Sequence, residues 1–356
     1  MVRVDWHRNP AILLVEAMAE HDLSVPAAEP SERRVGRRAF LAFVGAGAAA
    51  LALAPSSTAA RTSDRGGIYQ RIWDLDQAAN GVPAILAEEA GDRRQGFVKV
   101  DERAGQDPEH RLFAEVYIPA HKRNSYELCK ALFDNYRLDQ TKRENNRPEE
   151  AREILALLEA LTDSAPMIAA REHLEAQGGA RHSRDAWQEL IFNIWFRQSD
   201  DGDNLDLSAF EHVAVGEQKG GKVNGHHFWY KYYLDDWAAF SGEDDIDYDG
   251  SRYDGPHRRE GRLTPIGRQV PEVVTLAYSW EAYDFETRRR RAVYKPIGGF
   301  WVGCSIEGLL ALGTVRFFAH GHIETTINGA RYQIELYRSP DGRSLRTFFP
   351  RFLGIA

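Results

Sequence analysis

The order of hydrophobic patterns along the chain is the feature that most constrains its fold. Apolar residues recur at helical spacing from about residue 68 to residue 196, up to an acidic break at 199–204. Beyond that break the sequence is dominated by short runs of β-branched and aromatic residues. We therefore predict an α+β fold, with a helical N-terminal region over 61–198 followed by antiparallel sheets with flanking helices over 199–356.

Local signals predict where individual elements begin and end. Pro148 suits a first helical turn, and Ser183 can cap a helix with its hydroxyl. The turn dipeptides Asn328-Gly329 and Asp341-Gly342 separate the last three apolar runs, which predicts an antiparallel meander. The predicted helices cover 148–162, 166–177, 183–194, 227–240 and 305–315, and the predicted strands cover 273–283, 292–294, 323–327, 332–337 and 345–349.

Composition excludes several classes of protein. With 43% hydrophobic and 28% charged residues in 356, the chain can bury a core and is not a disordered protein. A net charge of −8 excludes a protein that coats nucleic acid without sequence preference, so any RNA contact must be local. Two cysteines, Cys129 and Cys304, cannot make a disulfide framework and allow at most one bridge.

The first sixty residues resemble an export signal. Arg37-Arg38-Ala39-Phe40-Leu41 matches the twin-arginine pattern RRxFL and precedes an uncharged run over 42–54 and small residues at 55–60. We predict a twin-arginine signal peptide with an extended n-region over 1–60, and hence a secreted or periplasmic bacterial protein with no membrane contact in its mature form. A membrane anchor is disfavoured because about 13 apolar residues span roughly 20 Å of the ~30 Å hydrocarbon core. Folding before export disfavours a disulfide.

A histidine-rich segment carries the strongest chemical signal. His212 and His227 lie fifteen residues apart on either side of a Gly-rich basic turn at 219–222. Because imidazole titrates near neutrality, two histidines that converge can serve as base and acid in one reaction. The alternative is that each is an ordinary core histidine.

Four separated motifs resemble the EndoU endoribonucleases, which prefer poly(U). They are FEHxxVGE at 210–217, GxHxW at 225–229, KPIGGF at 295–300 and TFFP at 347–350, in the family's order. The resemblance implies an EndoU-like catalytic region over 199–356, and it covers most of the chain beyond the predicted signal peptide.

The resemblance also implies catalytic roles. His212 and His227 would form the acid–base pair and Lys295 the electrostatic partner, while His226 occupies an aromatic position and receives no role. The expected reaction is cleavage of single-stranded RNA by its own 2′-hydroxyl, which leaves a 2′,3′-cyclic phosphate and a 5′-hydroxyl. This chemistry needs no cofactor. Alternatives are an inactive RNA-binding relative, or a secreted antibacterial toxin partnered by an immunity protein.

Two departures from the family pattern concern base recognition. Gly299 stands where the family has a serine thought to contact uracil, and Phe349 stands where it has a tyrosine, whereas Thr347 is retained. Because fewer hydrogen-bonding groups impose fewer penalties on the wrong base, we predict a relaxed or altered preference for uridine.

Other charged and metal-binding motifs are weaker. Glu211 and Glu217 resemble family glutamates that either support the histidines or relate to activation by a divalent cation, Mn or Ca. Residues 285–295 carry a net +4, and we predict that Arg291 and its neighbouring arginines steer the phosphate backbone, against the alternative of a solvated face. The DxDxDG motif at 245–250 has proline at position twelve, which excludes an EF-hand. His320 and His322 are interpreted as surface residues.

Overall fold

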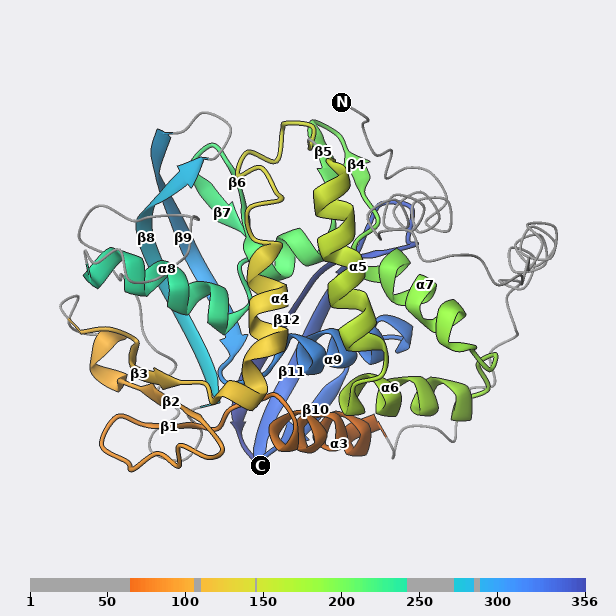
Figure 1. Cartoon of the computed structure of the whole chain (residues 1–356), viewed down its shortest axis with the longest axis horizontal. Helices are drawn as coiled ribbons and strands as arrows, with labels where there is room; N and C mark the ends of the chain where they lie inside the picture. Colours follow the sequence, from red (N-terminus) through yellow and green to blue (C-terminus); the bar gives the residue numbers. More distant parts are fainter. Residues whose placement is uncertain (1–64, 106–109, 145, 242–271, 285–288) are drawn as a thin grey trace, which may run out of the picture.

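The computed structural model describes residues 65–105, 110–144, 146–241, 272–284 and 289–356 (Figure 1). The predicted signal peptide, the DxDxDG motif and Arg288 lie outside the described residues. Within the described ranges, no helix has the length and apolar character needed to cross a membrane.

The N-terminal region contains five α-helices among its described residues, together with one small sheet. The helices are α3 (Arg65–Ala78), α4 (Arg123–Ala131), α5 (Pro148–Thr162), α6 (Ala165–Ala176) and α7 (Arg184–Trp195). The sheet has the order β1-β2-β3 and consists of β1 (Ala84–Leu86), β2 (Phe97–Val100) and β3 (Phe113–Tyr117). The helices expected at 148, 166 and 183 are confirmed, and the Ser183 hydroxyl accepts a hydrogen bond from the Ala186 amide.

The prediction of continuous helical structure from 68 to 196 is wrong between residues 84 and 117. The strands there are three to five residues long, too short for a two-residue period to be distinguished from one side of a helix. Pairing with one another stabilises these strands: β1 is parallel to β2, and β3 is antiparallel to it. Gly96, which has a positive φ of 80°, lies in the turn immediately before β2.

The described residues of the C-terminal region form two principal sheets and two α-helices. After the hairpin β4 (Ser199–Asp201) and β5 (Asn204–Leu207), one sheet has the order β6-β7-β9-β8. Its strands are β6 (Glu217–Lys219), β7 (Lys222–Asn224), β8 (Val273–Asp284) and β9 (Arg289–Trp301), and helix α8 (Trp229–Ser241) lies between β7 and β8 in sequence. The other sheet is the predicted meander, formed by β10 (Glu324–Ile327), β11 (Ala330–Arg338) and β12 (Leu345–Ile355). At its first turn Asn328 and Gly329 both have positive φ, as the dipeptide predicted.

Helix α9 (Ile306–Phe318) runs through the centre of the molecule (Figure 1). Residues 306–317 are all buried, and α3, α4, α6, α7 and β11 surround the helix. A helix that is apolar on all sides requires such a position. The hydrophobic core therefore runs without interruption through residues of both regions.

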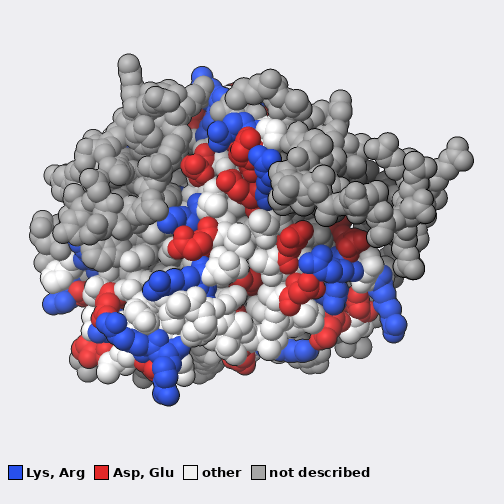
Figure 2. Space-filling view, viewed as in Figure 1, with Lys and Arg blue, Asp and Glu red and all other residues white. Residues whose placement is uncertain are grey.

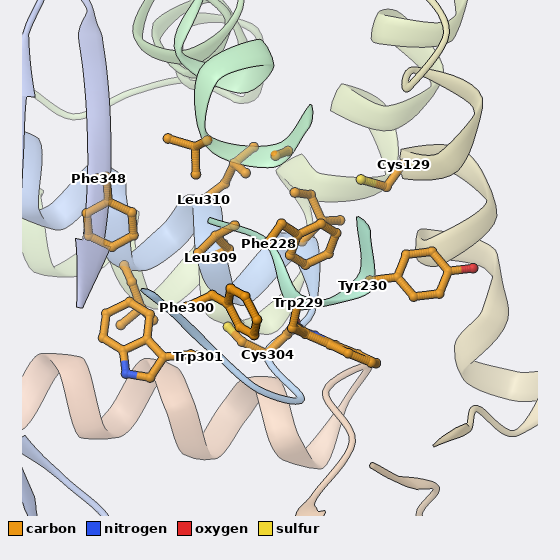
Figure 3. Close-up of a cluster of buried hydrophobic side chains, with 14 of the residues drawn as sticks. Cys129, Phe228, Trp229, Tyr230, Phe300, Trp301, Cys304, Leu309, Leu310 and Phe348 are labelled. Carbon is orange, nitrogen blue, oxygen red and sulfur yellow. The ribbon is translucent and has the colours of Figure 1, made fainter. Parts of the chain in front are cut away.

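Cys129 and Cys304 are both buried, free thiols within this core (Figure 3). Figure 3 shows them apart, with Trp229 and Phe228 among the side chains around them. Burial raises the pKa of both thiols, which keeps them protonated and unreactive.

Candidate active site

The two predicted catalytic histidines lie on adjoining backbone segments. His212 belongs to a π-helical turn (Glu211–Val215), and His227 belongs to the segment between β7 and α8. The His226 amide donates to the His212 carbonyl (2.8 Å) and the His227 amide to the Val213 carbonyl (2.6 Å). These hydrogen bonds bring the two imidazole centroids to 6.2 Å from each other.

Gly225 is what allows the two segments to come this close. It has a positive φ of 68°, and a Cβ there would lie 1.7 Å from the His212 carbonyl oxygen. We expect Gly225→Ala to destabilise the protein by about 3 kcal/mol, because it combines left-handed strain with a backbone clash. Urea unfolding provides the measurement. Gly220→Ala is the matched control, since Gly220 has a φ of 60° and open space around it. Equal shifts in the two urea midpoints would contradict the prediction.

His212 is held from behind by a carboxylate. It donates through Nδ1 to Oε1 of Glu217 at 2.6 Å, and Glu217 also forms an ion pair with Arg346. Burial opposes ionisation of Glu217, but the hydrogen bond from His212 and the charge of Arg346 lower its pKa. Burial, aided by the Arg346 charge and opposed by Glu217, lowers the pKa of His212 to about 4. The free protein therefore holds His212 neutral at pH 7. Its proton is on Nδ1, facing Glu217, and Nε2 carries a lone pair.

His227 is held by a carbonyl and an aromatic ring. Its Nδ1 donates to the Gly299 carbonyl oxygen at 2.9 Å, and its ring stacks on Phe349 with centroids 4.6 Å apart. Because a carbonyl can only accept, the proton is on Nδ1 and Nε2 carries a lone pair. Burial and the positive charge of Lys295 lower the pKa of His227 well below its usual value.

Lys295 is directed inward by a β-bulge. In the pairing of β8 with β9, Leu276 lies opposite Gly298 and Tyr278 opposite Lys295, so β9 has one extra residue. Lys295 as a whole is only 6% exposed, and no carboxylate of the described residues lies within 4 Å of its ammonium. Burial and the charge of Lys222 lower the pKa of Lys295 to about 8.

The predicted base-recognition residues also meet at this site, whereas the Arg291 side chain is half-exposed and lies near an acidic residue. Gly299 and Phe349 contact His227 directly. The Thr347 hydroxyl, on the same strand as Phe349, is buried and has no hydrogen-bond partner among the described residues. The Arg291 guanidinium lies 3.9 Å from the Asp139 carboxylate. Figure 2 shows positive and negative side chains interspersed on the described part of the viewed face, with no continuous basic field.

The two glutamates that resemble family glutamates differ in their surroundings. The Glu211 carboxylate accepts from the Ser208 amide, and burial together with the Glu217 charge raises its pKa well above the usual value. Glu217 is already occupied by His212 and Arg346. Among the described residues, no group of three or more His, Cys, Asp or Glu side chains could hold a metal ion.

Sequence reasoning missed Arg346 and the role of His226. Arg346 is the extra residue of a bulge in β12, between the pairs Arg338–Leu345 and Tyr337–Thr347, and the bulge directs it toward Glu217, 129 residues away in sequence. In the sequence, the sign that Arg346 belongs to the site was its position immediately before Thr347. His226 is a buried core residue whose ring bonds the Tyr278 hydroxyl and the Asp235 carboxylate. Since Tyr278 lies opposite Lys295 on the neighbouring strand, His226 connects the histidine segment to β8, the strand that pairs with the lysine strand β9.

Comparison with known proteins agrees with this site. The model of the family described as endoribonuclease XendoU matches residues 66–350. The chain belongs to the XendoU endoribonuclease family. A poly(U)-specific endoribonuclease of Xenopus tropicalis is 30% identical over 80% of this chain and 92% of the relative. A uridylate-specific endoribonuclease C of Danio rerio is 26% identical over 80% of this chain and 87% of the relative.

A solved XendoU structure, titled as a splicing-independent snoRNA processing endoribonuclease, has the same fold. It aligns with a TM-score of 0.59 at 21% identity and covers 83% of this chain and 99% of its own. The predicted α+β fold, the resemblance to the EndoU family and the identification of an endoribonuclease are confirmed.

Proposed function

We propose that this XendoU-family endoribonuclease cleaves single-stranded RNA by transesterification at His212, His227 and Lys295. One observation carries the proposal: two buried imidazoles 6.2 Å apart, each held through Nδ1, lie near a buried lysine that has no acidic partner among the described residues. A phosphodiester offers the missing negative charge. The Lys295 charge contributes to the low pKa of both histidines, which supports its nearness to them.

The partners of the two histidines suggest which is base and which is acid. His227 has a neutral carbonyl behind it and a cation beside it, so its neutral form is favoured and Nε2 can take the proton of the 2′-hydroxyl. His212 is neutral in the free protein, so to act as the acid it must take up a proton as the negatively charged phosphodiester binds. The Glu217 carboxylate behind it stabilises the resulting imidazolium, which then gives that proton to the departing 5′-oxygen. The 2′-oxygen attacks phosphorus, the 5′-oxygen leaves, and a 2′,3′-cyclic phosphate remains. Arg346 and Glu217 act as positioning residues for His212.

The same site supports a relaxed preference for uridine over the other bases. The named relatives are poly(U)-specific or uridylate-specific. In this chain Phe349 stacks on His227 and cannot donate a hydrogen bond, and Gly299 has no side chain. Of the three predicted base-recognition residues, Thr347 is therefore the one that offers a hydroxyl, which has no hydrogen-bond partner among the described residues.

Gly299→Ser is expected to sharpen the preference for uridine. An added Cβ would lie 3.3 Å from the Pro350 carbonyl oxygen, so serine fits after a small adjustment and introduces one hydroxyl. A hydrogen bond to the correct base contributes about 1 kcal/mol, or roughly fivefold in the ratio of cleavage after uridine to cleavage after other bases. The ratio is measured by sequencing the cut sites. Gly299→Ala, which adds the Cβ alone, is the control, and an equal ratio in both variants would contradict a contact with the base.

The cellular setting of this activity is proposed from the sequence alone. The RRxFL pattern and the small residues that follow support twin-arginine export to the periplasm or medium, with no membrane contact in the mature protein. If export serves attack on competitors, an immunity protein would accompany the enzyme. Activation by Mn or Ca is kept as a prediction, and no step of the proposed chemistry runs through a metal.

The test is to incubate the purified chain with a mixed-sequence RNA and analyse the new ends. We expect 2′,3′-cyclic phosphates and 5′-hydroxyls, enriched after uridine, and no cleavage at a uridine whose 2′-hydroxyl is methylated. RNA binding without cleavage, or cleavage that leaves 5′-phosphates, would overturn the proposal.

A further inference from the structure

One row of side chains crosses the sheet β6-β7-β9-β8 next to the catalytic lysine. Lys219 pairs with Lys222, Lys222 with Tyr294, and Tyr294 with Ser279, one residue from each strand. Residues directly opposite each other on neighbouring strands project from the same face of a sheet. The two lysines and the tyrosine therefore lie side by side on one face.

This row is on the outer face of the sheet. Tyr294 is 48% exposed, whereas Val293 and Lys295 on either side of it are buried on the opposite face. The alternation is the same on β7, where Lys222 is exposed and Val223 is buried. In the part of the chain that the structure describes, the Tyr294 ring stacks on no other ring, and no carboxylate lies within 4 Å of the Lys222 ammonium.

An exposed tyrosine beside two lysines on a sheet has the chemistry that binds single-stranded RNA. Unpaired bases stack on aromatic rings without regard to sequence, and ammonium groups neutralise the phosphates between them. Sheet faces suit this use because the strands hold the ring flat and rigid.

The row lies close to the cleavage site. Tyr294 immediately precedes Lys295, so their Cα atoms are about 3.8 Å apart, and the Lys222 charge contributes to the lowered pKa of Lys295. Lys222 and Tyr294 form the only pair between β7 and β9 among the described residues. The chain beyond β7 then turns into the segment that carries His227 (Figure 1).

We propose that Lys222 and Tyr294, with Lys219 at the edge, form a second RNA-binding site, which stacks a base of the strand outside the nucleotides being cut. The site rests on the proposed function for its substrate. It explains how an enzyme with a net charge of −8 holds a long RNA using few positive charges.

The test compares two substrates, the dinucleotide UpA and a 20-nucleotide uridine-containing single strand. The UpA molecule is too short to reach both sites at once. We expect Tyr294→Ala to lower the ratio of kcat/KM on the 20-mer to kcat/KM on UpA about tenfold, the size of a lost base stack. Tyr294→Phe, which keeps the ring, should restore the ratio, and Phe318→Ala, at an exposed aromatic on α9, is the matched control.

Binding separates this site from the proposed function. A 2′-O-methyl 20-mer cannot be cleaved by the 2′-hydroxyl route, and its affinity should fall about tenfold in Tyr294→Ala. Lys222→Gln should reduce the slope of log affinity against log salt by about 0.7, the value for one phosphate contact on a single strand. An unchanged ratio and unchanged affinity in Tyr294→Ala would overturn the second site. If the wild-type chain binds the 20-mer through Tyr294 but cleaves neither substrate, the second site holds and the proposed function fails.

Discussion

Replacing His227 by alanine is expected to lower kcat/KM on a uridine-containing RNA about 10³-fold, with the fold intact. General base catalysis contributes typically 10²–10⁴-fold, and 10³ corresponds to about 4 kcal/mol of transition-state stabilisation. His212→Ala should cost a similar factor. Because the two groups act in one transition state, the double variant should lose far less than the product of the two factors. Fold integrity is checked by the urea midpoint of each variant.

A change of leaving group distinguishes the two histidines. A substrate in which sulfur replaces the 5′-bridging oxygen leaves without needing a proton. If His212 is the acid, His212→Ala should recover most of its activity on this substrate, whereas His227→Ala should stay inactive. Recovery by His227→Ala instead would reverse the assignment. Loss of less than tenfold in both variants would remove the histidines from the mechanism.

Lys295→Ala is expected to lower kcat/KM about 10²–10³-fold, as loss of an oxyanion-type contact does. Lys99→Ala, at a lysine of β2 paired with Glu115, is the matched control and should have no effect.

The pH dependence of Lys295→Arg gives a sharper test. The pKa of Lys295 is lowered to about 8, so the ammonium is charged below pH 8 and is lost as pH rises through that value. Arginine keeps its charge throughout this range. The ratio of the kcat/KM of Lys295→Arg to that of the wild type should therefore be constant below about pH 7. It should rise toward tenfold per pH unit above 8.

Taking this ratio removes the titration of the histidines, which both proteins share. Measurements from pH 6 to 9.5, with a blank for uncatalysed RNA hydrolysis, are sufficient. A ratio that stays flat over the whole range would show that the lysine charge does not act in catalysis.

The sequence was most informative where a structure depends on neighbouring residues. Pro148 and Ser183 mark helix starts correctly because first-turn and capping preferences act within three or four residues. The meander was predictable because Asn328-Gly329 favours a tight turn by its own backbone geometry. The short strands over 84–117 were missed because partners elsewhere in the sheet, and not their own pattern, make them strands.

The sequence indicated the proposed catalytic groups but did not indicate their chemical state. Spacing and family resemblance singled out His212, His227 and Lys295 as types of group. Only the fold put Glu217 behind one imidazole and the Gly299 carbonyl behind the other, which is the basis for assigning acid and base. Burial in the folded protein, which the sequence does not reveal, lowers the pKa of Lys295 to about 8.

The sequence alone thus determined the fold class, the order of most of the described helices and the order of the last five strands, since these follow from local preferences. The family resemblance indicated the residues proposed to carry the chemistry. The tertiary structure decided which residues face one another. Arg346 reaches Glu217 across 129 residues through a bulge in β12, Lys295 faces inward through a bulge in β9, and Lys222 and Tyr294 align across strands. Contacts of this kind depend on the packing of distant segments, and no local pattern of residues encodes them.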